Sequence, residues 1–194
     1  MRRLVSFVLL FSLAIGAQAQ EIRGGYVGLA FGSFDFTQDD DDTGLRFSDT
    51  TSSYRVLGGY QFNSNYAVEA SWGATGDIKE SFYGFDPFLG DLSLEIKTDY
   101  EIATLRALAI APFSSTSIFG GAGYYDAKSN LAIRYQDDFE TVTFSDTGSD
   151  SGATIVGGVQ FELRRIAIRG EYEWFDTSGG VDAYNIGVSV LFRF

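Results

Sequence analysis

The residues that could carry chemistry are charged side chains spaced two apart along a few segments. Arg169, Glu171 and Glu173 show this spacing. Two carboxylates placed in this way could act as a general acid and a general base, and with arginines they could form ion pairs that exchange partners. We expect the interior face of the structure to carry the polar set Arg55, Glu69, Arg106, Gln160, Glu162, Arg169, Glu171, Glu173 and Arg193. Within this set we predict one interior cluster of opposite charges, formed by Arg55, Glu69, Arg106, Glu162, Arg169 and Glu171.

The sequence contains no histidine and no cysteine. A Ser–His or Cys–His nucleophile therefore cannot be built, and neither a disulfide framework nor a thiolate site can form. Carboxylate pairs that point from one strand into a filled interior are poorly placed for acid–base work. We predict a protein that is not an enzyme, with no catalytic residues and no cofactor.

A second group of carboxylates is the run Asp39, Asp40, Asp41 and Asp42, with Asp49 nearby. Several carboxylate oxygens suit Ca²⁺ or Mg²⁺, so the run is a weak candidate for divalent cations. It lacks the glycine turn and the spaced ligands of an EF-hand loop, which favours a solvated loop without a fixed metal. The formal net charge of −12 repels nucleic acid and attracts cations.

The N-terminus has the pattern of a secretory signal peptide. Two arginines precede an apolar stretch from Leu4 to Ile15, and the small-x-small triplet of Ala17, Gln18 and Ala19 follows. We predict a signal peptide over residues 1–19 and one folded domain over residues 20–194.

Eight segments show the period-two alternation of half-buried strands. They cover residues 24–36, 51–62, 66–75, 96–111, 117–127, 152–162, 166–176 and 183–194. Short connections at 63–65, 114–117 and 163–165 alternate with long ones at 37–50, 76–95, 128–151 and 176–182. All long connections therefore lie at one end. The pattern predicts an all-β, up-and-down antiparallel transmembrane barrel of eight strands.

Side-chain parity predicts which face meets lipid. Ile166, Ile168 and Trp174 alternate with Arg169 and Glu171, so the apolar face would point outward and the charged face inward. The segment 117–127 is too rich in glycine and aromatic residues to fix its parity. We also expect two aromatic belts, an outer one of Tyr54, Trp72, Trp174 and Tyr184 and an inner one of Phe62, Tyr66, Phe192 and Phe194.

A soluble secreted barrel or sandwich would show the same alternation with its apolar face inside. The polar face, however, mixes small residues with a few opposite charges, as suits a narrow filled interior. Alternating loop lengths and paired aromatic belts also have no required role in water. Both features favour the membrane barrel.

Three stretches, YRVLGGYQFNSNYAVEASW (54–72), IVGGVQFELRRIAIRGEYEWF (155–175) and YNIGVSVLFRF (184–194), resemble strands of the OmpA-like family of small eight-stranded outer-membrane β-barrels. The resemblance covers the barrel only and not a peptidoglycan-binding domain. Family members pair interior Glu and Arg side chains on neighbouring strands, and Glu69 and Arg169 occupy matching positions. The alternating apolar positions that end in an aromatic residue resemble the family's insertion signal, which the resemblance assigns to Phe194, Phe192 and Val190.

The resemblance implies a place in the cell outer membrane after export through the secretory pathway. Its expected partners are outer-membrane lipid, lipopolysaccharide and the barrel-insertion machinery. One hypothesis is a non-enzymatic barrel that supports envelope integrity and makes surface contacts through long acidic loops, with divalent cations bridging those carboxylates to lipopolysaccharide phosphates. The alternative is a narrow porin-like channel gated by the interior Arg and Glu pairs. An eight-stranded barrel is just wide enough for side chains to fill, which favours the first.

Overall fold

The computed structural model describes residues 23–40, 45–86, 90–136, 141–177 and 181–194, and every element in them is a β-strand. The strands are β1 (Gly24–Asp40), β2 (Leu45–Asn63), β3 (Tyr66–Thr75), β4 (Ile78–Asp86), β5 (Gly90–Phe113), β6 (Thr116–Gln136), β7 (Thr141–Leu163), β8 (Ile166–Asp176) and β9 (Val181–Arg193). No helix in these ranges is long and apolar enough to cross a membrane. The predicted signal peptide lies outside the described residues.

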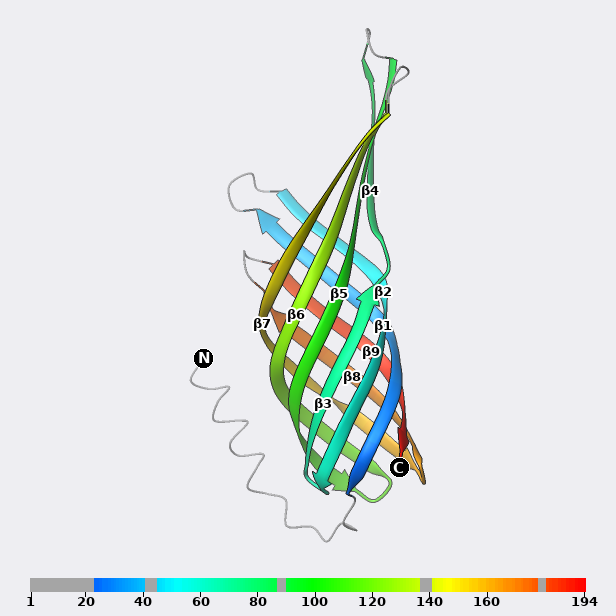
Figure 1. Cartoon of the computed structure of the whole chain (residues 1–194), viewed down its shortest axis with the longest axis vertical. Coiled ribbons are helices and arrows are strands. Elements are labelled where there is room, and N and C mark those ends of the chain that lie inside the picture. Colours follow the sequence, from blue (N-terminus) through cyan, green and yellow to red (C-terminus); the bar gives the residue numbers. More distant parts are fainter. Residues whose placement is uncertain (1–22, 41–44, 87–89, 137–140, 178–180) are drawn as a thin grey trace.

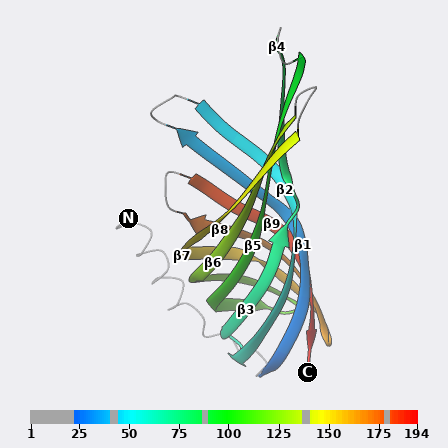
Figure 2. The same cartoon turned by 45° about the horizontal axis from the view of Figure 1, so that its top comes forward.

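Eight of these strands close into a ring. The order of neighbours is β3-β2-β1-β9-β8-β7-β6-β5, and β5 returns to pair with β3 from Tyr66↔Ala109 to Ala74↔Glu101. All of these pairings are antiparallel, and β1 lies beside β9. Figure 1 and Figure 2 show the resulting barrel from two directions. The predicted eight-stranded, up-and-down antiparallel barrel is confirmed.

A ninth strand, β4, lies outside the ring. It pairs with the outer half of β5 from Ile78↔Thr98 to Asp86↔Gly90, so the segment 76–95 is a hairpin and not the loop that the sequence suggested. Strands β6 and β7 likewise stay paired up to Gln136↔Thr141, where a long loop was expected. Beyond the barrel wall a strand has no lipid-facing side, so the criterion of an outward apolar face does not detect it. Figure 1 shows these strands rising above the rest of the barrel.

The opposite end is closed by tight turns between β2 and β3, β5 and β6, and β7 and β8. Ser114 and Arg164 each begin a two-residue turn with a φ of 61° and 58°. A positive φ at the first of the two central residues alone is the pattern of a type II′ hairpin turn, whose twist matches that of the flanking strands. In the turn between β2 and β3, the Asn63 Oδ1 atom accepts hydrogen bonds from the backbone N–H groups of Asn65 and Tyr66 at 2.8 and 3.0 Å.

The outward face of the ring is apolar, as predicted. Along β8, exposed residues at Ile166 and Ile168 alternate with buried Ala167 and Arg169. The parity of β6, which the sequence left open, is now clear, since Ile118 and Tyr124 point outward while Phe119 and Tyr125 are buried. Such a band of exposed apolar side chains around a whole barrel suits contact with lipid and not with water.

Candidate functional site: the charged interior and the outer cup

The interior of the barrel holds a compact cluster of charged side chains, the charge cluster. Its members come from four strands, and each has at most 7 % of its surface exposed. They are Arg55 on β2, Glu69 on β3, Arg106 on β5, Arg169 on β8, and Glu171 and Glu173 on β8. The three positive and three negative charges cancel. A balanced set is the arrangement that makes buried charge tolerable.

Glu69 is the centre of one half of the charge cluster. Its Oε1 atom accepts hydrogen bonds from Arg106 Nε and Nη2 at 3.0 and 2.6 Å. Its Oε2 atom accepts from Arg169 Nη1 at 2.6 Å and from the Tyr26 hydroxyl at 2.8 Å. The structure therefore brings Glu69 and Arg169 together, and one carboxylate serves two guanidinium groups.

Glu171 and Glu173 form the other half. Arg55 donates to both carboxylates, and Arg106 reaches Glu171 Oε2 at 3.3 Å and Glu173 Oε2 at 2.9 Å. Thr154 donates to Glu173 Oε1 at 3.0 Å. Arg106 thus contacts all three carboxylates, so the two halves form one network.

Glycine provides the space that the arginines need. A Cβ atom on Gly123 would meet the Leu105 carbonyl oxygen and lie 2.7 Å from Arg106 Cβ. On β3, a Cβ atom on Gly73 would meet the side chain of Arg55. In a barrel of eight strands there is little interior volume, and these two positions let large side chains pack against bare backbone.

Glu162 does not join the charge cluster, contrary to the sequence-based grouping. It lies near the tight-turn end and pairs with Arg193, with Oε1 and Nη2 2.9 Å apart, and its side chain is 23 % exposed. On β7, Glu162 lies two residues from Gln160. Gln160 links the charge cluster to the pair of Glu162 and Arg193, because it accepts a hydrogen bond from Arg169 at 3.1 Å and donates one to Glu162 at 2.9 Å. The residue spacing predicted correctly that Glu162 faces inward, but it could not predict the height of the side chain along the barrel axis.

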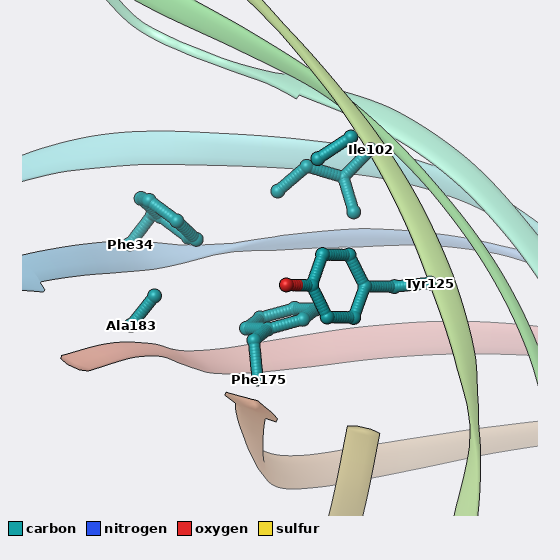
Figure 3. Packing of buried hydrophobic residues seen from close by; sticks show 6 residues of the cluster. Phe34, Ile102, Tyr125, Phe175 and Ala183 are labelled. Atoms are coloured by element: carbon teal, nitrogen blue, oxygen red, sulfur yellow. The ribbon is translucent and has the colours of Figure 1, made fainter. Parts of the chain in front are cut away.

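Above the charge cluster, the barrel interior becomes aromatic and opens into a cavity of about 270 Å³, here called the outer cup. Figure 3 shows its deeper side chains pointing toward one another, among them Phe34, Ile102, Tyr125, Phe175 and Ala183. The described lining residues are Phe34, Phe36, Tyr100, Ile102, Tyr125, Ala127, Ser129, Gly148, Ser149, Asp150, Phe175, Thr177 and Ala183. Tyr100 lies one residue beyond the last pair of the ladder between β3 and β5, Ala74↔Glu101, and burial there raises the pKa of its hydroxyl.

The acidic candidates stand apart from both sites. Asp41 and Asp42 lie outside the described residues, as do Asp137, Asp138 and Glu140, while Asp39 and Asp40 end β1. Asp49 is exposed on β2. Within the described ranges, no three His, Cys, Asp or Glu residues form a group that could hold a metal ion. Divalent-cation binding at the acidic run stays a prediction.

The three residues of the predicted insertion signal occupy the tight-turn end. Val190 and Phe192 point outward and are 52 % and 48 % exposed, and Phe194 is 76 % exposed. The Phe194 backbone N–H donates to the Gly25 carbonyl at 3.0 Å, which extends the contact between β9 and β1. Their role in insertion stays a prediction.

Sequence reasoning missed the outer cup because it assigned aromatic residues to lipid. Phe34 follows Ala30 and Gly32 on the inward parity, and Phe175 follows Glu171 and Glu173 in the same way. The parity itself therefore carried the signal. Tyr26, which donates to Glu69, could have been found by the same rule.

Comparison with known proteins agrees with this geometry. The sequence model of the family described as outer membrane protein beta-barrel domain matches residues 5–194. Among curated proteins, no sequence matches the chain.

Solved structures of low sequence identity share the fold. Ail, the attachment invasion locus protein of Yersinia pestis, has a TM-score of 0.55 at 17 % identity over 88 % of this chain and 99 % of its own. Neisserial surface protein A has a TM-score of 0.55 at 15 % identity, and OprG from Pseudomonas aeruginosa 0.51 at 16 %. For both, the match covers 91 % of this chain and 100 % of the other. The closed ring, its apolar outer face and the family match together show that this chain belongs to the outer membrane protein β-barrel family, as an OmpA-like barrel of the cell outer membrane.

Proposed function

We propose that the protein is a closed, non-enzymatic barrel that supports the integrity of the outer membrane and makes contacts at the cell surface. The observation that carries the proposal is the charge cluster, in which side chains from β2, β3, β5 and β8 meet across the interior. Glu69 and Glu173 have no exposed surface, and Arg106 has 1 %. We expect side chains packed in this way to block a continuous water path through the middle of the barrel.

The cavity that directly adjoins the charge cluster is small, which supports a closed state. Between the outer cup and the charge cluster lies a cavity of about 10 Å³ that Arg55 and Asn185 help to line. About one water molecule fits into a volume of that order. Ions or solutes would therefore need the cluster to rearrange before they could pass.

A narrow channel is the second candidate, and one feature of the cluster favours it. Glu171 is bound by Arg55, lies 3.3 Å from Arg106 and lies 3.9 Å from Arg169. A carboxylate with three cations in reach could change partners at small cost. Gating by such an exchange is the mechanism that a channel would use.

Single-channel recording in planar bilayers separates the two candidates. The closed barrel predicts no discrete openings for the folded wild-type chain across a range of voltages. Reproducible openings that change when Glu69→Gln or Arg169→Met is introduced would contradict it and support the channel. Glu162→Gln is the matched control, because Glu162 lies outside the charge cluster.

The structural role predicts an envelope phenotype. Cells that lack the gene should leak periplasmic enzymes and become more sensitive to detergent, and the wild-type gene should reverse both defects.

We further propose that divalent cations bridge acidic outer residues to lipopolysaccharide phosphates, in keeping with the net charge of −12. Chelation of Mg²⁺ should then increase leakage more in wild-type cells than in cells that carry Asn at positions 39–42. Equal leakage in the two strains would remove the bridge from the proposal.

A further inference from the structure

The end of the barrel that carries the tight turns is basic, although the chain as a whole has a formal net charge of −12. In the described part of the chain, the turns, the adjoining three residues of each strand and the residue before β1 carry the arginine side chains Arg23, Arg164, Arg165 and Arg193. The same positions carry one carboxylate side chain, Glu162, which is paired with Arg193. A surplus of positive charge therefore remains at this end.

Arg164 and Arg165 make up the turn between β7 and β8. Both residues are exposed, and their side chains form no ion pair or hydrogen bond with the described residues. Arg164 has a φ of 58°, in the left-handed region that the first central position of such hairpin turns usually gives to glycine or asparagine. The turn geometry therefore does not account for the arginine, and both guanidinium groups are available to a ligand.

The two arginines lie at the edge of the lipid-facing surface. Leu163 and Ile166 directly flank the turn, pair with each other and are 50 % and 45 % exposed. Phe192 lies beside Ile166 on β9 and is 48 % exposed. The short turns of outer-membrane barrels lie on the periplasmic side. A lipid of the periplasmic leaflet whose acyl chains cover these apolar side chains would therefore hold its headgroup at the height of the turn.

The chemistry of the turn selects a phosphate group. Guanidinium groups bind phosphate through paired, charge-assisted hydrogen bonds, and two adjacent cations favour a phosphate that no ammonium group in the same headgroup neutralises. We propose that Arg164 and Arg165 form a binding site for an anionic phospholipid of the periplasmic leaflet, with its phosphate on the two guanidinium groups and its acyl chains against Leu163 and Ile166. The site does not depend on whether the barrel is closed or conducts.

The test measures lipid binding to the full mature chain, folded in detergent micelles, by native mass spectrometry. Phosphatidylglycerol and phosphatidylcholine with the same acyl chains are titrated, and glycerol 3-phosphate serves as a phosphate without chains. The proposal predicts an apparent affinity for phosphatidylglycerol that is higher than that for phosphatidylcholine by about tenfold or more, and no binding of glycerol 3-phosphate at the same concentrations. Equal affinity for the two lipids would overturn the site, and equally tight binding of glycerol 3-phosphate would overturn the lipid as its ligand.

Variants locate the charge that is responsible. Arg164→Asn combined with Arg165→Gln removes both charges, and it should lower the affinity for phosphatidylglycerol by about tenfold, to the level of phosphatidylcholine. Lys128→Gln combined with Arg134→Gln is the matched control, because it removes the same charge from exposed positions on the outer half of β6. The control should bind as the wild type does. An equal loss in the two double variants would mean that general surface charge attracts the lipid and would overturn the site.

The turn itself offers a variant that should fold well. Asparagine suits the positive φ of position 164, so Arg164→Asn alone should keep the folded form in the heat-dependent gel mobility assay even if the double variant does not. It should lower the affinity for phosphatidylglycerol by about fivefold. Wild-type affinity in this folded variant would contradict the proposal.

Discussion

At the scale of the residue, the charge cluster shows how a barrel interior accepts charge. Each buried guanidinium contacts at least one carboxylate, and Glu69 also receives the Tyr26 hydroxyl. The Arg169 guanidinium also lies over the Phe119 ring, 4.7 Å from its centroid. Loss of one partner leaves an opposite charge buried without compensation, which costs more than the pair itself contributes.

Glu69→Gln should therefore destabilise the barrel strongly. The substitution leaves three arginines against two carboxylates, and we expect the free energy of unfolding to fall by about 3 kcal/mol. Unfolding in urea from lipid vesicles, followed by gel mobility, measures the change. Glu162→Gln, in the partly exposed pair with Arg193, should cost less than about 1 kcal/mol. Similar losses in both variants would argue against a cooperative cluster.

Gly123→Ala should also be destabilising, for a steric reason. The new methyl group would meet the Leu105 carbonyl and the Arg106 side chain, and overpacking of this kind costs about 1 to 3 kcal/mol. Gly170→Ala on the outward face of β8 is the control, because nothing lies within 4 Å of its added Cβ atom. The same unfolding measurement applies. A neutral Gly123→Ala variant would show that Arg106 can move aside.

At the scale of the element, the sequence predicted the strands that face lipid and missed those that do not. Alternation of apolar and polar residues located β3 and β8 almost to the residue. The same alternation cannot find β4 or the outer half of β7, since both faces of those segments meet water. The height of each inward residue along the barrel axis could not be predicted, because side-chain parity says nothing about strand tilt. For this reason the sequence grouped Glu162 with the other charged residues.

The hairpin of β4 and the outer half of β5 should be dispensable for the barrel. The ladder between β3 and β5 ends at Ala74↔Glu101, and the Tyr100 backbone N–H donates to Thr75 Oγ1 at 3.0 Å. Replacing residues 76–99 by Asn-Gly should therefore join Thr75 to Tyr100 through a type I′ turn. We expect the variant to keep its heat-dependent gel mobility. Loss of the folded band would show that the hairpin takes part in closing the ring.

At the scale of the whole molecule, every other conclusion depends on the apolar face of the barrel wall pointing outward and the polar face pointing inward. Val188 and Ile168 are 55 % and 43 % exposed on the outer surface, and Ser189 between β1 and β8 is fully buried. Composition, strand parity and loop lengths were enough to predict this orientation. The aromatic content of the interior could not be predicted from hydropathy, which assigns every such ring to lipid.

Fluorescent labels at Val188 and Ile168 should report a lipid environment. In vesicles, quenchers attached to lipid chains should reduce their emission, while iodide in the water should have little effect. A label at Asp146, exposed on the outer part of β7, should show the opposite preference. Strong quenching by iodide at Val188 would contradict the membrane orientation.

The uninterrupted ring sets the route by which any occupant of the outer cup must come and go. Within a bilayer an unpaired backbone group costs several kcal/mol, and every strand of the ring is hydrogen-bonded on both sides. An exit through the barrel wall between two neighbouring strands would break many backbone hydrogen bonds at once. Residence times should therefore depend on the segments around the rim and stay insensitive to the thickness or fluidity of the surrounding lipid.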